Sequence, residues 1–296
     1  MNNHHQHEFG GNWTDEKLLR VRKYLTAYAT ILKKKFKFAY IDAFAGTGYR
    51  ENKVKADNEN QLSLFNEAEL KEIGAFSEGS ARIALQTNPP FDKYIFIEKS
   101  KKHFSELQRL KDEFPDKAKQ IELVNANANE YLLDRCNNYK WQNHRAVLFL
   151  DPYGMQVGWE TIKAIAKTEA IDLWYLFPLG IGLNRLLKKD HKSIPESWKI
   201  KITNILGTNE WENTFYNDVE VQTLFGNQTS KEKVTDFYKI SNFVVERLKS
   251  IFPGVAKNAL LLRNSKNNPL YLLCFASGNP KGAKTAVKIA QDILKR

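Results

Sequence analysis

Short apolar runs alternate with amphipathic segments along most of the chain. Five of the runs have the length and near-continuous apolar character of strands buried on both faces of a parallel sheet. The segments around them repeat apolar residues every three or four positions, which is the spacing of helices. The predicted strands are residues 38–44, 94–98, 121–124, 146–151 and 171–177. The predicted helices are residues 18–32, 104–114, 159–167, 234–251 and 282–294.

The last two apolar runs, residues 259–262 and 270–275, flank the polar sequence 264–268, which has hairpin chemistry. Strands that alternate with helices predict a doubly wound parallel sheet. A closing hairpin adds an antiparallel strand, whereas an NAD-binding fold would end in another parallel unit. The pattern therefore predicts an α/β, Rossmann-like class I methyltransferase fold, with a mostly parallel seven-stranded sheet and a C-terminal antiparallel hairpin.

Two polar stretches interrupt this pattern. Residues 49–78 are charged and lack apolar periodicity, so we interpret them as an inserted loop. Residues 183–230 are interpreted as a second, mostly helical insertion, and residues 1–36 as an N-terminal helical extension. One methyltransferase-like domain spanning residues 1–296 can absorb both insertions.

Charge is distributed unevenly between the two parts of the chain. Residues 183–296 contain 19 Lys or Arg and 10 Asp or Glu, whereas residues 1–182 contain 26 and 24. A basic last third favours a polyanionic partner, but a solvated surface can have the same composition.

The cysteines and the apolar content bear on the compartment. Cys136 and Cys274 stand in apolar surroundings, which indicates free thiols in a reducing environment. The sequence has no apolar run of about 18 residues, and its first residues lack the pattern of a signal peptide. We therefore expect a cytoplasmic protein. Apart from the N-terminal group His4, His5 and His7, the histidines are not spaced as metal ligands, so no metal is expected.

Glycines follow the first predicted strand in the sequence Asp42-Ala-Phe44-Ala-Gly46-Thr-Gly48. Glycines at the carboxyl end of a strand allow a sharp turn and a close approach to a ligand. The segment resembles the FxGxG form of the S-adenosylmethionine-binding motif and differs from the GxGxxG dinucleotide fingerprint. A generic glycine turn is the alternative. The prediction is that Asp42, Phe44, Gly46 and Gly48 hold the cofactor.

Two further polar residues follow the second and third predicted strands. Glu98 can accept both ribose hydroxyls of a nucleoside cofactor, and removing the insertion 49–78 places it the expected distance of about 20 residues after the glycines. Asn127 stands where this fold often carries an acidic residue that binds adenine, and its carbonyl oxygen can accept the same hydrogen bond. Its alternative role is a turn or helix cap.

The fourth predicted strand ends in Asp151-Pro152-Tyr153-Gly154. An aspartate and a backbone carbonyl can accept the hydrogens of an exocyclic amino group, and an aromatic ring can stack on a flipped base. The motif resembles the (D/N/S)PP(Y/F/W) of nucleic-acid amino methyltransferases and the DPFG-type sequence of tRNA guanine N2-dimethyltransferases, although one proline is missing. A strand-ending turn is the alternative. Asp151, Pro152 and Tyr153 are the predicted catalytic residues.

Basic residues interleave with aromatic ones after the fifth strand. Arg185, Lys188 and Lys189 are spaced almost as on a helix, with tryptophans and a tyrosine nearby. This combination suits phosphate contact and base stacking, so these residues and Tyr153 are the predicted substrate-binding residues. An ordinary amphipathic insertion would look the same.

Nearly the whole chain is similar to one family, the three-Cys-motif partner proteins. The similarity is carried by HEFGGNWT from residue 7, KL from 17, YIDAFAGTG from 40, LFLDPYGMQVGW from 148, IDLWYLFPLG from 171 and PLYLLCFASGNPKG from 269. This resemblance implies a methyltransferase-like fold, S-adenosylmethionine as cofactor, and a partner related to radical S-adenosylmethionine proteins with a three-cysteine motif. It also implies Trp13 and Lys17 as residues at the rim of the cofactor pocket, and the alternative is a buried tryptophan that packs against the helix and a solvated lysine.

The insertion 49–78 contains one peptide of a different kind. Residues 61–65, from Gln61 to Phe65, read QLSLF and resemble the pentapeptide that binds the bacterial sliding clamp. Such a peptide binds as an extended segment whose Leu and Phe enter an apolar groove. An apolar patch that folds back on the protein is the alternative.

Three functions fit these features. The first is an S-adenosylmethionine-dependent methyltransferase acting on an exocyclic amino group of a nucleic-acid base, DNA or RNA. The second is a cofactor-binding or non-catalytic subunit that serves the three-Cys-motif partner. The third is a methyltransferase acting on a small molecule or a peptide.

Overall fold

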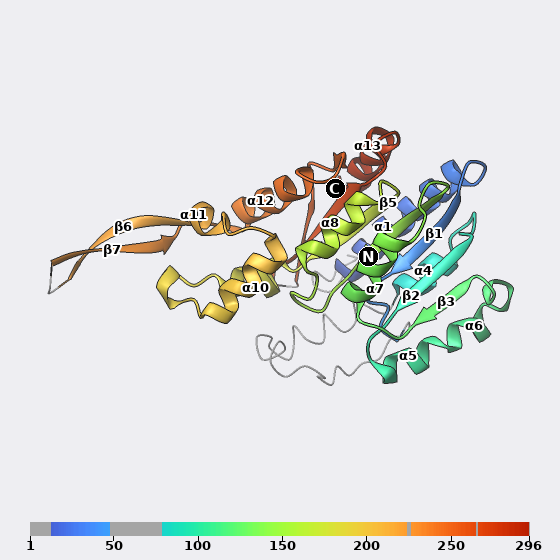
Figure 1. The fold of residues 1–296 in the computed structure, drawn as a ribbon, viewed down its shortest axis with the longest axis horizontal. Helices are drawn as coiled ribbons and strands as arrows, with labels where there is room; N and C mark the ends of the chain where they lie inside the picture. The colour runs from blue at the N-terminus through green and yellow to red at the C-terminus, as the bar shows by residue number, and fades with distance from the viewer. Residues whose placement is uncertain (1–12, 48–78, 224–225, 265, 296) are drawn as a thin grey trace, which may run out of the picture.

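In the computed structural model, a mixed β-sheet lies between two layers of helices (Figure 1). The structure describes residues 13–47, 79–223, 226–264 and 266–295. The strand order of the sheet is β3-β2-β1-β4-β5-β10-β8, and β9 also pairs with β10. The first five strands are mutually parallel, and β10 is antiparallel to β5, β8 and β9. The predicted α/β fold class is therefore confirmed.

The parallel strands fall within two residues of the predicted apolar runs. They are β1 (Lys37–Asp42), β2 (Lys93–Ile97), β3 (Ile121–Val124), β4 (His144–Leu150) and β5 (Ile171–Phe177). The antiparallel part consists of β8 (Gly254–Val255), β9 (Leu260–Arg263) and β10 (Pro269–Ser277). The predicted hairpin is the β9–β10 pair, and the two-residue β8 makes the sheet eight-stranded rather than seven-stranded.

Successive strand residues point to opposite faces, so each face has its own apolar cluster. One face is covered by α1 (Trp13–Leu32), α4 (Ser80–Leu85), α5 (Lys101–Leu107), α6 (Arg109–Glu113) and α13 (Ala283–Leu294). The other is covered by α7 (Ala128–Asn138), α8 (Trp159–Lys167), α10 (Glu196–Leu206) and α12 (Phe237–Lys249).

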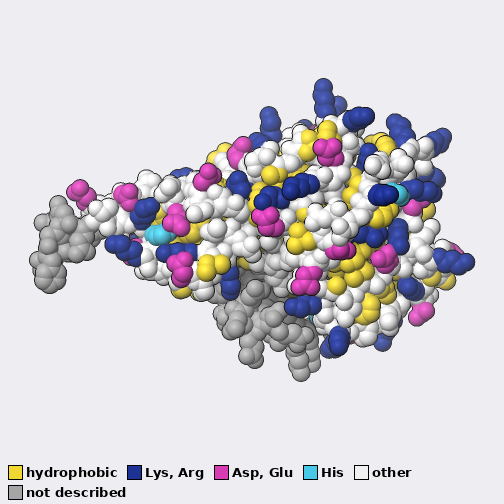
Figure 2. Space-filling model, in the orientation of Figure 1, with side chains coloured by type: hydrophobic (Ala, Val, Ile, Leu, Met, Phe, Trp, Pro, Cys, Tyr) yellow, Lys and Arg dark blue, Asp and Glu magenta, His cyan; other side chains and the backbone are white. Residues whose placement is uncertain are grey.

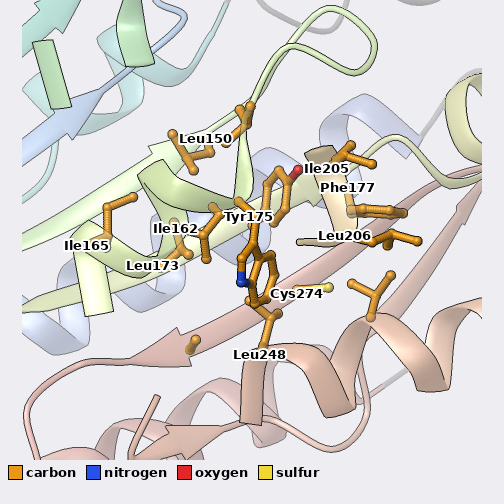
Figure 3. Packing of buried hydrophobic residues seen from close by; sticks show 14 of the residues in the cluster. Leu150, Ile162, Ile165, Leu173, Tyr175, Phe177, Ile205, Leu206, Leu248 and Cys274 are labelled. Carbon is orange, nitrogen blue, oxygen red and sulfur yellow. The ribbon is translucent and has the colours of Figure 1, made fainter. Parts of the chain in front are cut away.

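The cluster on the second face shows how the layers interlock (Figure 3). Leu173 of β5 lies beside Ile162 of α8, the ring of Tyr175 of β5 points toward Ile205 of α10, and Leu206 of α10 and Leu248 of α12 complete the cluster from two other sides. All six side chains are buried. Burying each large apolar side chain contributes roughly 1.5–3 kcal/mol, so this face fixes the positions of β4 and β5.

The second predicted insertion is only partly helical. After β5 come a π-helical turn (Leu179–Leu183) and the short helices α9 (Asn184–Leu186) and α11 (Trp211–Phe215), together with α10. The segment then forms an antiparallel ribbon, β6 (Tyr216–Thr223) with β7 (Gly226–Lys233), which projects from the body (Figure 1). The sequence did not predict this ribbon because β7 consists only of glycine and polar residues and therefore shows no apolar alternation.

Other boundaries differ in detail from the predictions. The helix predicted at 104–114 is divided into α5 and α6, and α7 was not predicted. The inserted loop 49–78 lies outside the described residues. Both cysteine thiols are free and buried. Among the described helices, none combines the length and the apolar character needed to cross a membrane.

Candidate functional site

The carboxyl ends of four neighbouring strands carry most of the predicted site residues. Asp42 ends β1, and Glu98 and Asp151 directly follow β2 and β4. Asn127 follows β3 after a short turn. The chain order reverses between β1 and β4, and doubly wound sheets bind their ligands at such a switch point. The structure therefore brings these predicted residues to one edge of the sheet.

The glycine turn and Glu98 are joined directly. Gly46 has φ 59°, a left-handed conformation that favours glycine, and its amide donates a 3.0 Å hydrogen bond to Oε2 of Glu98. The amide of Ser100 donates a 2.7 Å bond to Oε1 of the same carboxylate. Glu98 is 11% exposed. A carboxylate has about four lone-pair sites, so Glu98 can accept further hydrogen bonds after shaping the turn.

Asp42 lies beneath this turn rather than on its surface. Its carboxylate is fully buried and accepts hydrogen bonds from the Tyr40 hydroxyl (3.3 Å) and the Phe44 amide (3.3 Å). A third comes from the hydroxyl of Ser80, the first residue of α4. Asp42 therefore positions the glycine turn from within. Tyr40 and Ser80 were not predicted, although Tyr40 precedes Asp42 by two residues and so shares its face of the strand.

Lys17 contacts Asp151 at the switch point. Its ammonium nitrogen lies 2.7 Å from Oδ2 of Asp151 and 5.0 Å from the centre of the Phe149 ring. Lys17 is 0% exposed. The ammonium group of Lys17 therefore lies in the interior beside the buried carboxylate rather than on an exposed rim. A role of Lys17 toward the cofactor stays a prediction.

Burial shifts the titration of all three charged groups. It raises the pKa of Asp42 and of Asp151 to about 6, and the nearby ammonium of Lys17 opposes both shifts. It lowers the pKa of Lys17 to about 8, and the two carboxylates oppose that shift. At pH 7 these values leave one ammonium beside two carboxylates, so the switch point retains negative charge.

The turn after β4 has a rigid part and a more accessible part. Asp151 and Pro152 are buried, Tyr153 is half-buried, and Gly154 has φ 70°. Tyr271 of β10 is 1% exposed. Burial, with the charge of Asp151 as the next contribution, raises the pKa of Tyr271 well above its ordinary value. The sequence did not single out Tyr271, which reaches this edge because β10 runs antiparallel.

The asparagines after β3 connect the strand ends. The side-chain amide of Asn125 donates to the carbonyl oxygens of Glu98 (2.8 Å) and Lys99 (3.0 Å). Asn127 is the N-cap of α7, and its Oδ1 accepts the Asn129 amide at 2.9 Å. The helix-cap alternative thus describes the contact in the structure, while adenine binding by Asn127 stays a prediction.

Asn129 holds the loop that follows the Asp151 turn. Its Nδ2 donates to the Gln156 carbonyl at 2.8 Å, and its Oδ1 accepts the Gly158 amide at 3.1 Å and the Thr161 hydroxyl at 2.8 Å. No sequence motif indicated this role, because it depends on the packing of α7 beside α8.

The predicted substrate-binding cations lie beyond β5. Arg185 is half-buried in α9 and has contacts of its own. Lys188 and Lys189 are exposed, and the ammonium of Lys188 lies 4.8 Å from the centre of the Trp198 ring. Their carbonyl oxygens accept hydrogen bonds from Tyr216 and Lys233, which begin and end the ribbon. These contacts connect the segment to the ribbon, and its role toward a substrate stays a prediction.

Three predicted features cannot be placed. Gly48 and the QLSLF peptide, Gln61 to Phe65, lie outside the described residues. The backbone of Trp13 begins α1, but its side chain is not described.

Comparison with known proteins gives similarity in fold only. No family model matches the chain, and no curated protein matches it in sequence. A solved protein of Legionella pneumophila is 16% identical over 81% of this chain and 93% of its own, with a TM-score of 0.40. Spermidine synthase of Thermotoga maritima is 11% identical over 97% and 72%, with a TM-score of 0.41. A Listeria monocytogenes protein classed as an S-adenosylmethionine-dependent methyltransferase is 10% identical over 88% and 98%, with a TM-score of 0.35. The strand order of the chain itself, with β10 antiparallel beside β5, gives it a Rossmann-like class I methyltransferase fold.

Proposed function

We propose that the chain binds S-adenosylmethionine and methylates an exocyclic amino group of a nucleic-acid base. The observation that carries this proposal is the meeting of the Gly46–Glu98 turn and the Asp151 turn at one switch point of the sheet. A methyl donor and an acceptor nitrogen react only when both are held in line, and neighbouring strand ends can hold both.

The residues at the switch point fit this cofactor. Glu98 retains acceptor sites for ribose hydroxyls, and the left-handed turn at Gly46 allows close approach of a ligand to the backbone. Asp42, Asp151 and Lys17 together leave negative charge, which complements a cationic ligand. When bound, S-adenosylmethionine would supply a methyl group activated by a sulfonium centre.

The remaining chemistry belongs to the Asp151 turn. Since Lys17 binds Oδ2, the carboxylate stays ionised near neutral pH and keeps Oδ1 as an acceptor for an amino hydrogen. Pro152 restricts the backbone behind it, and the half-buried Tyr153 offers a ring on which a base can stack. Catalysis of this kind depends on orientation and needs no covalent intermediate.

One observation favours a second candidate, a cofactor-binding subunit that catalyses nothing itself and serves a partner with a three-cysteine motif. Asp151 is 4% exposed and already has a strong charged partner in Lys17. In a catalytic site we expect the amino-group acceptor to be more open to its substrate. A buried ion pair is, by contrast, consistent with a scaffold that only holds the cofactor.

Two measurements separate these candidates. Calorimetric titration with S-adenosylmethionine and its demethylated product should show binding that Glu98→Gln weakens at least 10-fold, while the exposed control Glu130→Gln leaves it unchanged. Transfer of labelled methyl groups to bulk DNA and to tRNA should fall at least 100-fold in Asp151→Asn, measured at a cofactor concentration that saturates the variant because the substitution also removes a negative charge from the site. Binding without transfer would support the second candidate, and an absence of binding would overturn both.

A further inference from the structure

The two longest stretches of the sequence without an acidic residue lie away from the predicted substrate-binding cations. Segment 183–233 is nearly balanced in charge, and the basic excess of the last third comes from the residues after it. Residues 247–291 contain no aspartate or glutamate, and neither do residues 17–41. The first stretch includes α13 up to Gln291, and the second includes α1 from Lys17 onward, after Asp15 and Glu16 in the first turn of that helix.

The two helices pack side by side on one face of the sheet. A side-chain nitrogen of Arg20 in α1 donates hydrogen bonds to the carbonyl oxygens of Ile293 and Lys295 at the end of α13. Since the start of α1 meets the end of α13, the helices run antiparallel. The end of α1 therefore lies toward the start of α13.

Exposed cations follow both helices, and we call them the basic face. Its residues are Arg22, Lys23, Lys33 and Lys34 in and after α1, with Lys284 and Lys288 in α13. Asp292 of α13 is already paired with Lys295 at 2.9 Å. Lysine and arginine side chains stand out along the edge of the molecule at which α13 lies (Figure 2).

The charge of this surface indicates its partner. Its cations in and after α1 run from Arg22 to Lys34, which is roughly 18 Å at the rise of a helix, or about half of the 34–36 Å of one turn of a nucleic-acid duplex. We infer that the basic face binds the phosphate backbone of a double-stranded nucleic acid. This inference deepens the proposed function and rests on it for the identity of the substrate. It adds that the substrate is double-stranded and contacts α1 and α13.

Two other polyanions fit less well. A membrane-binding helix needs a continuous exposed apolar face. In α1 only Leu19 and Ile31 are exposed large apolar side chains, and they lie near opposite ends of the described part of the helix. Other apolar residues of the two helices, such as Leu25 and Leu294, are buried against the sheet. Single-stranded nucleic acid is held by exposed aromatic rings, but Tyr24 and Tyr28 of α1 are buried. Cations with few exposed apolar or aromatic neighbours match phosphates on a duplex surface.

The basic face also leads to the candidate site. α1 carries Lys17, which binds Asp151 at the carboxyl edge, and it ends beside the opposite edge of the sheet, where β1 begins. A duplex lying along α1 therefore has one end near the Asp151 turn. The surface and the site would then contact the same molecule.

The test measures binding of a 20-base-pair duplex of mixed sequence, as DNA and as RNA, by fluorescence anisotropy at several salt concentrations and without cofactor. The test variant is Lys33→Ala/Lys34→Ala/Lys284→Ala/Lys288→Ala. The control, Lys101→Ala/Lys102→Ala/Lys119→Ala/Lys140→Ala, removes as many exposed lysines from outside α1 and α13, in α5, before β3 and before β4. Log affinity falls with log salt concentration, and each phosphate contact contributes about 0.9 to the steepness of that fall. The test variant, which lacks four lysines, should therefore have a slope that is shallower by about 3 to 4.

The control should keep at least three quarters of the wild-type slope. Equal losses in both variants, or no duplex binding by the wild-type chain, would overturn the inference. Binding of anionic phosphatidylserine vesicles in preference to duplex, lost in the test variant, would overturn it in favour of a membrane surface. The binding test does not depend on methyl transfer. If the duplex binds as expected but the separate transfer assay shows no methylation, only the proposed function is overturned.

Discussion

The ammonium nitrogen of Lys17 lies 2.7 Å from Oδ2 of Asp151, although 134 residues separate them in the sequence and neither side chain is more than 4% exposed. This contact ties the first described helix to the switch point of the sheet. Both the stability of the fold and the charge of the candidate site depend on it.

Replacement of Lys17 by methionine should destabilise the chain by about 3–5 kcal/mol, because it leaves the carboxylate of Asp151 buried without its charged partner. In the double variant Lys17→Met/Asp151→Asn the uncompensated charge is gone, so the loss should be smaller than the sum of the two single losses. Urea unfolding of all four chains gives the coupling energy. A cost of under 1 kcal/mol for Lys17→Met would contradict this account.

Asp172 should give the stability a pH dependence that the variant Asp172→Asn lacks. Its carboxylate is buried and accepts a 2.6 Å hydrogen bond from the Tyr24 hydroxyl, and burial raises its pKa to about 6. The folded chain therefore holds this proton more tightly than the unfolded chain. The stabilisation is complete below about pH 4 and is lost as the pH rises through 6, by about 3 kcal/mol in all.

The measurement compares urea unfolding of wild type and Asp172→Asn from pH 4 to pH 8. The free energy of unfolding of wild type, relative to the variant, should fall across pH 4–6 and stay level above that range. A relative stability that rises over the same range would show that the carboxylate is stabilised in its ionised form.

Asn129 should matter more than its neighbour Asn127. Alanine at position 129 removes all three hydrogen bonds to the loop at Gln156 to Thr161 and should cost about 2–3 kcal/mol. Alanine at position 127 removes one helix cap, at about 1 kcal/mol. If Asn129 positions the Asp151 turn, Asn129→Ala should also lower methyl transfer per folded molecule. Thermal unfolding of Asn129→Ala and Asn127→Ala compares the two losses of stability. Equal losses would contradict the role of Asn129 in holding the loop.

The outer part of the ribbon should be dispensable for folding. Val219 pairs with Ser230, so an Asn-Gly turn in place of residues 220–229 would join two paired residues by a two-residue hairpin loop. Buried Tyr216 stays in the shortened chain. The free energy of unfolding should change by less than about 1 kcal/mol. A loss of several kcal/mol would mean that the outer ribbon packs against the body.

Most of the sheet could be predicted because buried strands leave apolar runs. β3, β5 and α8 begin and end where the pattern predicts. The apolar pattern could not predict the β6–β7 ribbon or the two-residue β8. The β7 strand of the ribbon has no apolar residue. The β8 strand is too short to leave a pattern and is defined by its pairing with Ala276 and Ser277 of β10.

The candidate site was predicted by residue type more successfully than by geometry. Motif positions identified Gly46, Glu98 and Asp151, because strand ends mark where a parallel sheet binds ligands. Sequence spacing could not show that Lys17 reaches Asp151 or that Tyr271 arrives from β10, since both contacts depend on tertiary packing.

The position of β10 has a consequence for biosynthesis. This strand lies between β5 and the short strands β8 and β9, yet it is synthesised after all the other described strands of the sheet. Until it emerges from the ribosome, β5 is an unpaired apolar edge open to pairing with other chains. The sheet therefore cannot close beside β5 until residues 269–277 have been made, and a nascent chain halted before Pro269 should depend on chaperones to stay unaggregated.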